Sequence, residues 1–72
     1  MATPAPQPCA RKRELLLDFA KAVSEYHRLQ SAQMRAVIEG RGFQLEKELW
    51  QAAIRRENAK YAILAHQSDH GC

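Results

Sequence analysis

Residues 14–39, ELLLDFAKAVSEYHRLQSAQMRAVIE, decide the fold because their apolar side chains recur at helical spacing. At about 100° per residue, apolar side chains gather on one side of a single helix and charged side chains on the other. The apolar side is centred on these residues: Leu16, Phe19, Ala20, Val23, Tyr26, Met34, Val37 and Ile38. A second apolar set runs along one edge of it: Leu15, Ala22, Leu29 and Ala36. A stripe this broad needs more than one neighbouring helix to cover it.

Composition bounds the molecule to one small helical domain. The chain has 72 residues, with only three Gly and three Pro and a formal net charge of +3. The basic residues are spread along the chain, and a short patch at residues 11–13 is too small to predict a nucleic-acid partner. No apolar run approaches the roughly 18–20 residues of a membrane span, so no membrane partner is expected. A core of this size supplies little net stability, and a partner chain is the usual remedy.

Two glycines mark a tight turn after the first helix. Gly40 suits the left-handed residue that follows a helix, and Gly42 suits a weak N-cap for the next one. The sequence therefore predicts an all-α fold, an antiparallel two-helix hairpin. Its expected segments are a disordered Pro-rich tail at 1–9, a helix at 10–39, a turn at 40–42, a helix at 43–67 and a flexible His/Cys tail at 68–72.

The second helix carries two apolar stripes. One of them, which includes Leu45, Leu49 and Ile63, is expected to face the first helix. The other needs a different neighbour, and a second copy of the chain is the simplest candidate. We therefore expect a homodimer that forms a four-helix bundle. The expected interface residues are Phe43, Trp50, Ile54 and Tyr61 on the second helix and Leu29 on the first.

A polar layer is expected near the middle of the hairpin. With the bend near Arg41, residues whose numbers add to about 82 lie opposite each other, so Tyr26 meets Arg56 and can stack on it. The layer consists of His27, Gln30, Arg56 and Lys60. We interpret it as a device that fixes the register of the helices. A functional pocket with His27 as acid or base is the alternative, but no nucleophile–base set accompanies it, and we expect no enzyme.

The C-terminal end holds the residues with the most distinctive chemistry. His66 and His70 are four apart and share a helix face, and Cys72 follows two residues later. The hairpin brings Cys9 to the same end, so two histidines and two cysteines form a zinc-compatible set. Three interpretations stay open: a frayed helix end whose histidines suit the negative dipole, a zinc site, and a Cys9–Cys72 disulfide. A reducing cytoplasm disfavours the disulfide.

A tail of the form His-x-x-x-His-x-Cys that ends the second helix of a short hairpin resembles that of small uncharacterised bacterial proteins. Those proteins also have a first helix rich in Tyr and His and a second helix rich in Ala. The resemblance implies a bacterial, cytoplasmic two-helix protein, and it brings no activity or site residue with it.

From these observations the sequence predicts a non-enzymatic interaction or scaffold module that self-associates in the cytoplasm. A heterologous helical protein could occupy the same surface. The alternative function is a metal-binding or thiol redox sensor that uses the Cys9, His66, His70 and Cys72 end. Apart from zinc in that alternative, no cofactor is expected.

Overall fold

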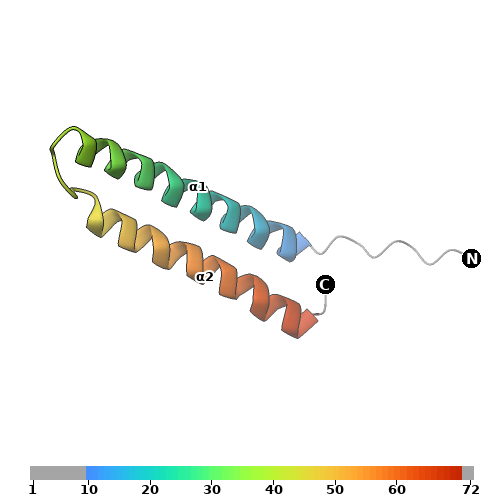
Figure 1. Cartoon of the computed structure of the whole chain (residues 1–72). Helices are drawn as coiled ribbons and strands as arrows, with labels where there is room; N and C mark the ends of the chain where they lie inside the picture. Colours follow the sequence, from blue (N-terminus) through green and yellow to red (C-terminus); the bar gives the residue numbers. More distant parts are fainter. Residues whose placement is uncertain (1–9, 71–72) are drawn as a thin grey trace, which may run out of the picture.

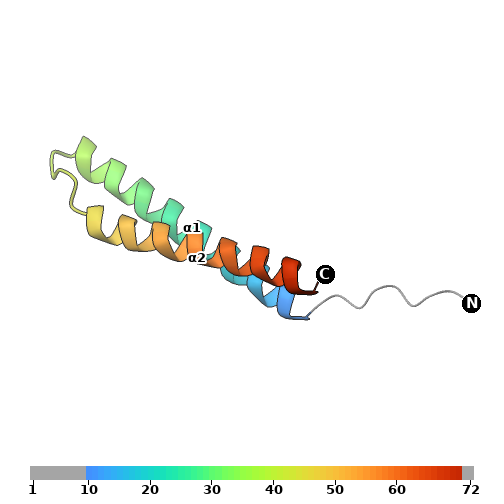
Figure 2. The same cartoon turned by 90° about the horizontal axis from the view of Figure 1, so that it is seen from below.

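The computed structural model describes residues 10–70, with the side chains from Ala10 to Asp69. It contains two helices, α1 (Ala10–Ile38) and α2 (Glu46–His70), and the described residues include no strand. Figure 1 shows the helices running antiparallel side by side, with the start of α1 and the end of α2 at the same end of the hairpin. The view from below in Figure 2 shows that the two helices cross at a shallow angle. The predicted all-α hairpin is confirmed.

The helices meet along a seam with the spacing of an antiparallel coiled coil. In each helix the seam residues alternate at intervals of three and four, which keeps one stripe turned toward the partner helix. Every seam residue is buried or half-buried, and Ala52 is fully covered. The seam of α1 consists of Leu15, Phe19, Ala22, Tyr26, Leu29, Gln33 and Ala36; that of α2, with the residue before it, consists of Leu45, Leu49, Ala52, Arg56, Ala59, Ile63 and His66.

The most buried apolar residues of α1 come from the edge set, whereas of the central set Phe19 and Tyr26 join the seam and the other members lie outside it. Leu15, Leu29 and Ala36 are 6%, 8% and 3% exposed, whereas Leu16 and Met34 are 46% and 62% exposed. The edge residues repeat every seven positions, so they stay turned toward α2 as the two helices wind around each other. The alanines on both sides of the seam also let the backbones approach closely.

The end of α1 is closed by a left-handed glycine. Gly40 has a φ of +79°, as predicted from the sequence. The Gly40 N–H donates to the Val37 carbonyl at 3.0 Å, and the Arg41 N–H donates to the Ala36 carbonyl at 2.8 Å. These two bonds form a Schellman motif, which satisfies carbonyls that the helix end leaves without partners.

The bounds of α2 differ from those predicted. The helix begins at Glu46 rather than at residue 43, because Gly42 has a φ of +79° and so starts no helix. Leu45 takes the N-cap position instead, and its carbonyl accepts the first helical bond, from the Leu49 N–H at 2.8 Å. The helix also continues past residue 67 to His70, since residues 43–70 contain no Gly or Pro to end it. The expected tail at 1–9 lies outside the described residues.

Candidate interaction face

The two sides of the hairpin differ sharply in chemistry. In an antiparallel pair, the residues that follow the seam by one position in α1 and in α2 lie on the same side of the hairpin. On that side the side chains are largely apolar, and we call this surface the open apolar face. It consists of Leu16, Ala20, Val23, Met34 and Val37 from α1 and the loop–α2 residues Phe43, Trp50, Ala53 and Leu64.

A groove at the loop end shows that both helices contribute to this face. It has a volume of about 300 Å³ and lies between Met34 and Val37 of α1, Phe43 of the loop and Leu49 of α2. Its floor is formed by residues of the seam. The face is therefore a continuous surface across the hairpin rather than two separate helix stripes.

The large side chains of the open apolar face are mostly in contact with water. Phe43 and Trp50 are 67% and 69% exposed, and Met34 is 62% exposed. An aromatic side chain has roughly 150–250 Å² of surface, so the two rings alone leave roughly 300 Å² in water. Leu16 and Leu64, about half exposed, form a second apolar area of this face near the chain ends. Patches beyond a few hundred Å² mark contact sites on small proteins.

A polar band crosses the middle of the same face. The Arg56 guanidinium carbon lies 4.3 Å from the centre of the Tyr26 ring, which confirms the predicted stacking. Glu57 pairs with Lys60 at 2.8 Å and with Arg56 at 3.6 Å. The hydrogen bond from Lys60 holds the pKa of the Glu57 carboxyl below its ordinary value, and the same bond raises the pKa of Lys60. Both groups therefore stay charged over a wider pH range than in water.

The predicted polar layer is only half-covered by the hairpin itself. Arg56 and Lys60 are half-buried, whereas His27 and Gln30 are exposed. The His27 ring contacts Tyr26 edge to face, with centroids 6.1 Å apart. His27, Gln30 and Lys60 lie beside the seam on the side of the open apolar face, and Arg56 lies in the seam itself, so a partner on this face would meet the first three.

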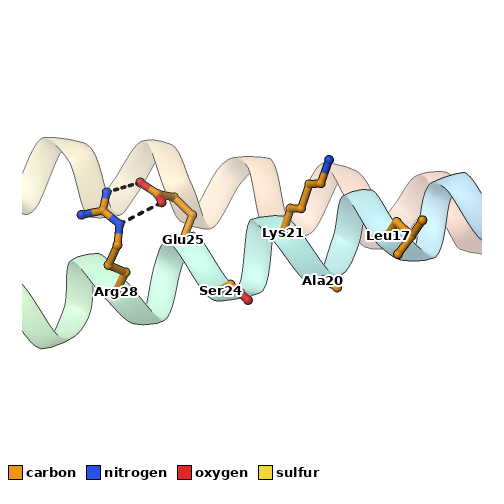
Figure 3. Close-up of a pocket in the computed structure, with 6 residues that line it drawn as sticks. All are labelled: Leu17, Ala20, Lys21, Ser24, Glu25 and Arg28. Atoms are coloured by element: carbon orange, nitrogen blue, oxygen red, sulfur yellow. Dashed lines mark hydrogen bonds and ion pairs between the residues drawn. The ribbon is translucent and has the colours of Figure 1, made fainter.

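The opposite side of the hairpin is charged. The Arg28 guanidinium donates two hydrogen bonds to the Glu25 carboxylate, and the first of them, from Nε, is 3.0 Å long. This bonding lowers the pKa of Glu25 and raises that of Arg28. Figure 3 shows this pair in a shallow depression whose six lining residues all come from α1 and reach around the helix to Ala20 of the open apolar face. Further charged residues follow on this side: Asp18, Lys21, Arg35, Glu48 and Arg55. The side is suited to water, in contrast to the open apolar face.

Gln33 is the most buried polar side chain of residues 10–69, and it is not among the residues predicted from the sequence. It is 7% exposed and lies in the seam close to the loop. Its Oε1 accepts the Leu45 N–H at 2.6 Å, and its Nε2 donates to Glu46 Oε1 at 2.9 Å. Gln33 thus holds the start of α2 from the other helix, because it accepts from the N-cap residue Leu45 and donates to Glu46, the first residue of the helix. The seven-residue interval from Tyr26 to Gln33 could have placed it in the seam.

Replacing Gln33 with leucine is expected to lower the free energy of unfolding by about 1–3 kcal/mol, because the partly buried Leu45 N–H loses its acceptor. Urea denaturation followed by circular dichroism measures the change. Gln51→Leu, at an exposed position of α2, is the matched control and should change stability little. Equal effects of the two substitutions would show that the hydrogen bonds of Gln33 contribute nothing.

The predicted zinc set lies largely beyond what the structure describes. Cys9 and Cys72 are outside the described residues, and so is the side chain of His70. His66 is half-buried at the end of the seam. Among the side chains that are described, no group of three or more potential metal ligands comes together. The metal and disulfide interpretations stay predictions.

The five predicted interface residues fall in three different places. Phe43 and Trp50 lie on the open apolar face. Ile54 and Tyr61 lie on the outer side of α2, away from the seam, at 41% and 59% exposed. Leu29 is buried in the seam against α2 inside the chain and does not lie on the open apolar face. The reason is the seven-residue repeat, which puts Leu29 in the seam.

No protein-family model, curated protein or solved structure matches this chain. Within residues 10–70, neither helix has both the length and the hydropathy that crossing a bilayer requires. Function is therefore inferred from the side chains of the hairpin.

Proposed function

We propose that this chain is a non-enzymatic helical interaction module that self-associates through its open apolar face. The observation that carries the proposal is the exposure of Met34, Phe43 and Trp50 on a single side of the hairpin. Burial of a side chain of this kind stabilises a complex by about 1.5–3 kcal/mol. A surface with this composition binds by burial of hydrocarbon.

The position of the face around each helix fits a four-helix bundle. In such a bundle every helix has two neighbours, so it needs two apolar stripes roughly a quarter-turn apart. In α1 the seam residue Leu15 is followed directly by Leu16 of the open apolar face. Ala22 and Ala36 of the seam stand in the same relation to Val23 and Val37. Two hairpins joined by this face would give each helix its second neighbour, and the charged sides would remain in water.

The proposal places the module in a bacterial cytoplasm, where Cys9 and Cys72 stay reduced and a disulfide plays no part in assembly. The apolar seam and the open apolar face then provide the stability that a chain of this size lacks alone. A heterologous helix that competes for the same face is a different occupant, and a chain that remains monomeric in solution would point to it.

Light scattering after size exclusion tests the proposal. The chain has a mass of 8.2 kDa, so a dimer is expected at twice that value. The mass should stay the same with a reductant and with a chelator. A monomer at every concentration up to the millimolar range would overturn self-association. A dimer that dissociates with chelator or reductant would show that the cysteine and histidine end holds the assembly, and the proposal would fall.

A further inference from the structure

The arrangement of the two copies can be derived from the open apolar face. The contact between Tyr26 and Arg56 fixes the register of the hairpin, so residues whose numbers add to about 82 lie at one height along it. By this rule Met34 is level with the region of Trp50, and Leu16 is level with the region of Leu64. The face thus has an apolar cluster near the loop, a second near the chain ends, and the polar band between them.

Two hairpins can pack with their open apolar faces against each other in two symmetric ways. In both, the two-fold axis lies in the plane of the interface between the two copies. If the axis is parallel with the helices, both loops lie at one end, and α1 packs on the partner's α2. If the axis is perpendicular to the helices, the loops lie at opposite ends, and α1 packs on the partner's α1. Both arrangements give antiparallel neighbours, so the side chains must decide between them.

With the axis parallel with the helices, the register rule of the hairpin also holds between the copies. Met34 then meets the partner's Trp50, and Leu16 meets the partner's Leu64. In the polar band, His27 meets the partner's Glu57, which places a hydrogen-bonding ring against a carboxylate. Each apolar cluster of one copy then packs against an apolar cluster of the partner, and the two-fold symmetry repeats every such contact once.

With the axis perpendicular to the helices and centred on them, apolar side chains meet polar ones. Met34 falls opposite the partner's Arg13, and Trp50 falls opposite the partner's Gln67. This arrangement does bring Glu57 near the partner's Lys60. An exposed ion pair contributes little, however, compared with the burial of a tryptophan and a methionine from each copy.

We propose that the occupant of the open apolar face is a second copy of this chain, packed with α1 on the partner's α2 and with both loops at the same end. The inference rests on the self-association proposed above and adds the geometry of the pair. It assigns His27 and Glu57 as residues that face each other across the interface.

The distance between two spin labels, measured by electron paramagnetic resonance, tests how the two copies are arranged. A nitroxide label at Gln44→Cys, in a chain that also carries Cys9→Ser and Cys72→Ser, puts one probe on each loop. Loops at one end give a label separation below about 35 Å. Loops at opposite ends give roughly 45 Å or more, since the 29 residues of α1 at about 1.5 Å each separate the two ends.

The outcomes separate the two proposals. A dimer with the short distance supports both, and a dimer with the long distance overturns the geometry alone. A labelled chain with a monomer mass and no measurable separation overturns self-association itself, provided that the unlabelled chain is also a monomer.

Cysteine crosslinking gives a second measurement that does not depend on the loop. A mixture of the Leu16→Cys and Leu64→Cys chains, each in the same cysteine-free background, is expected to form a mixed disulfide dimer under mild oxidation. Each chain alone should form its dimer at least several-fold more slowly. Equal rates for the mixed and the single-variant reactions would overturn the pairing of α1 with the partner's α2.

Discussion

Replacing Met34 and Trp50 together with glutamate is expected to convert the proposed dimer into a helical monomer. Each side chain gains about 1.5–3 kcal/mol on burial, and the two-fold symmetry removes four such side chains from the interface. The loss of about 6 kcal/mol or more weakens association by roughly four orders of magnitude. Sedimentation equilibrium at micromolar concentration measures the change in mass, and circular dichroism shows whether the monomer remains helical.

The matched control puts the same charges on surfaces that face water. Ser31→Glu and Gln51→Glu lie at exposed positions of α1 and α2 away from the open apolar face. This double variant is expected to keep the dimer mass. If the Met34 and Trp50 variant also keeps the dimer mass, the open apolar face is not the interface.

Replacing Leu29 with alanine is expected to cost about 2–5 kcal/mol of unfolding free energy, because it opens a cavity in the seam. Leu29 is 8% exposed, and Ala52, which the register places opposite it on α2, has little side chain to fill the space. For a hairpin of this length such a loss is a large part of the total stability. Thermal unfolding followed by circular dichroism should show a strongly lowered midpoint.

Leu17→Ala makes the same chemical change at an exposed position of the same helix. Leu17 is 55% exposed, so its truncation should change the free energy of unfolding by less than about 1 kcal/mol. Both variants change helix propensity in the same way, so the difference between their free energies of unfolding reports the effect of burial. Similar midpoints for both would mean that the seam is not the core of the hairpin.

The sequence was sufficient for the features that depend on local chemistry. Helical periodicity and a glycine-bounded turn predicted two antiparallel helices, and Gly40 has the left-handed conformation expected of it. The register followed from the turn alone and was accurate enough to place Arg56 on Tyr26. These features need only the geometry of one helix or of the few residues that join two helices.

The choice between two apolar stripes was beyond the same reasoning. Hydrophobicity favours the stripe through Leu16 and Met34, because it contains more large side chains than the edge through Leu15 and Leu29. Packing against a winding partner depends on repetition at seven residues, which the smaller edge set satisfies. Apolar content alone therefore favours the surface that the hairpin leaves exposed to water.

Polar contacts between distant residues explain the remaining errors. The start of α2 depends on Gln33, twelve positions away from Leu45, and no local pattern around residue 43 reveals that bond. The zinc-compatible end depends on side chains outside the described residues, so it stays a prediction.

The start of α1 and the end of α2 lie together at one end of the hairpin, far from the loop (Figure 1). A domain fused before α1 and a domain fused after α2 would therefore both lie at the same end of the hairpin. With both loops at the opposite end, a pair of chains would hold four attachment points within a few nanometres. Two weak binding modules attached there would reach a high effective concentration toward each other and toward a shared target. In such a fusion, pairing of the hairpins would make the overall binding to a shared target tighter than the binding of either module alone.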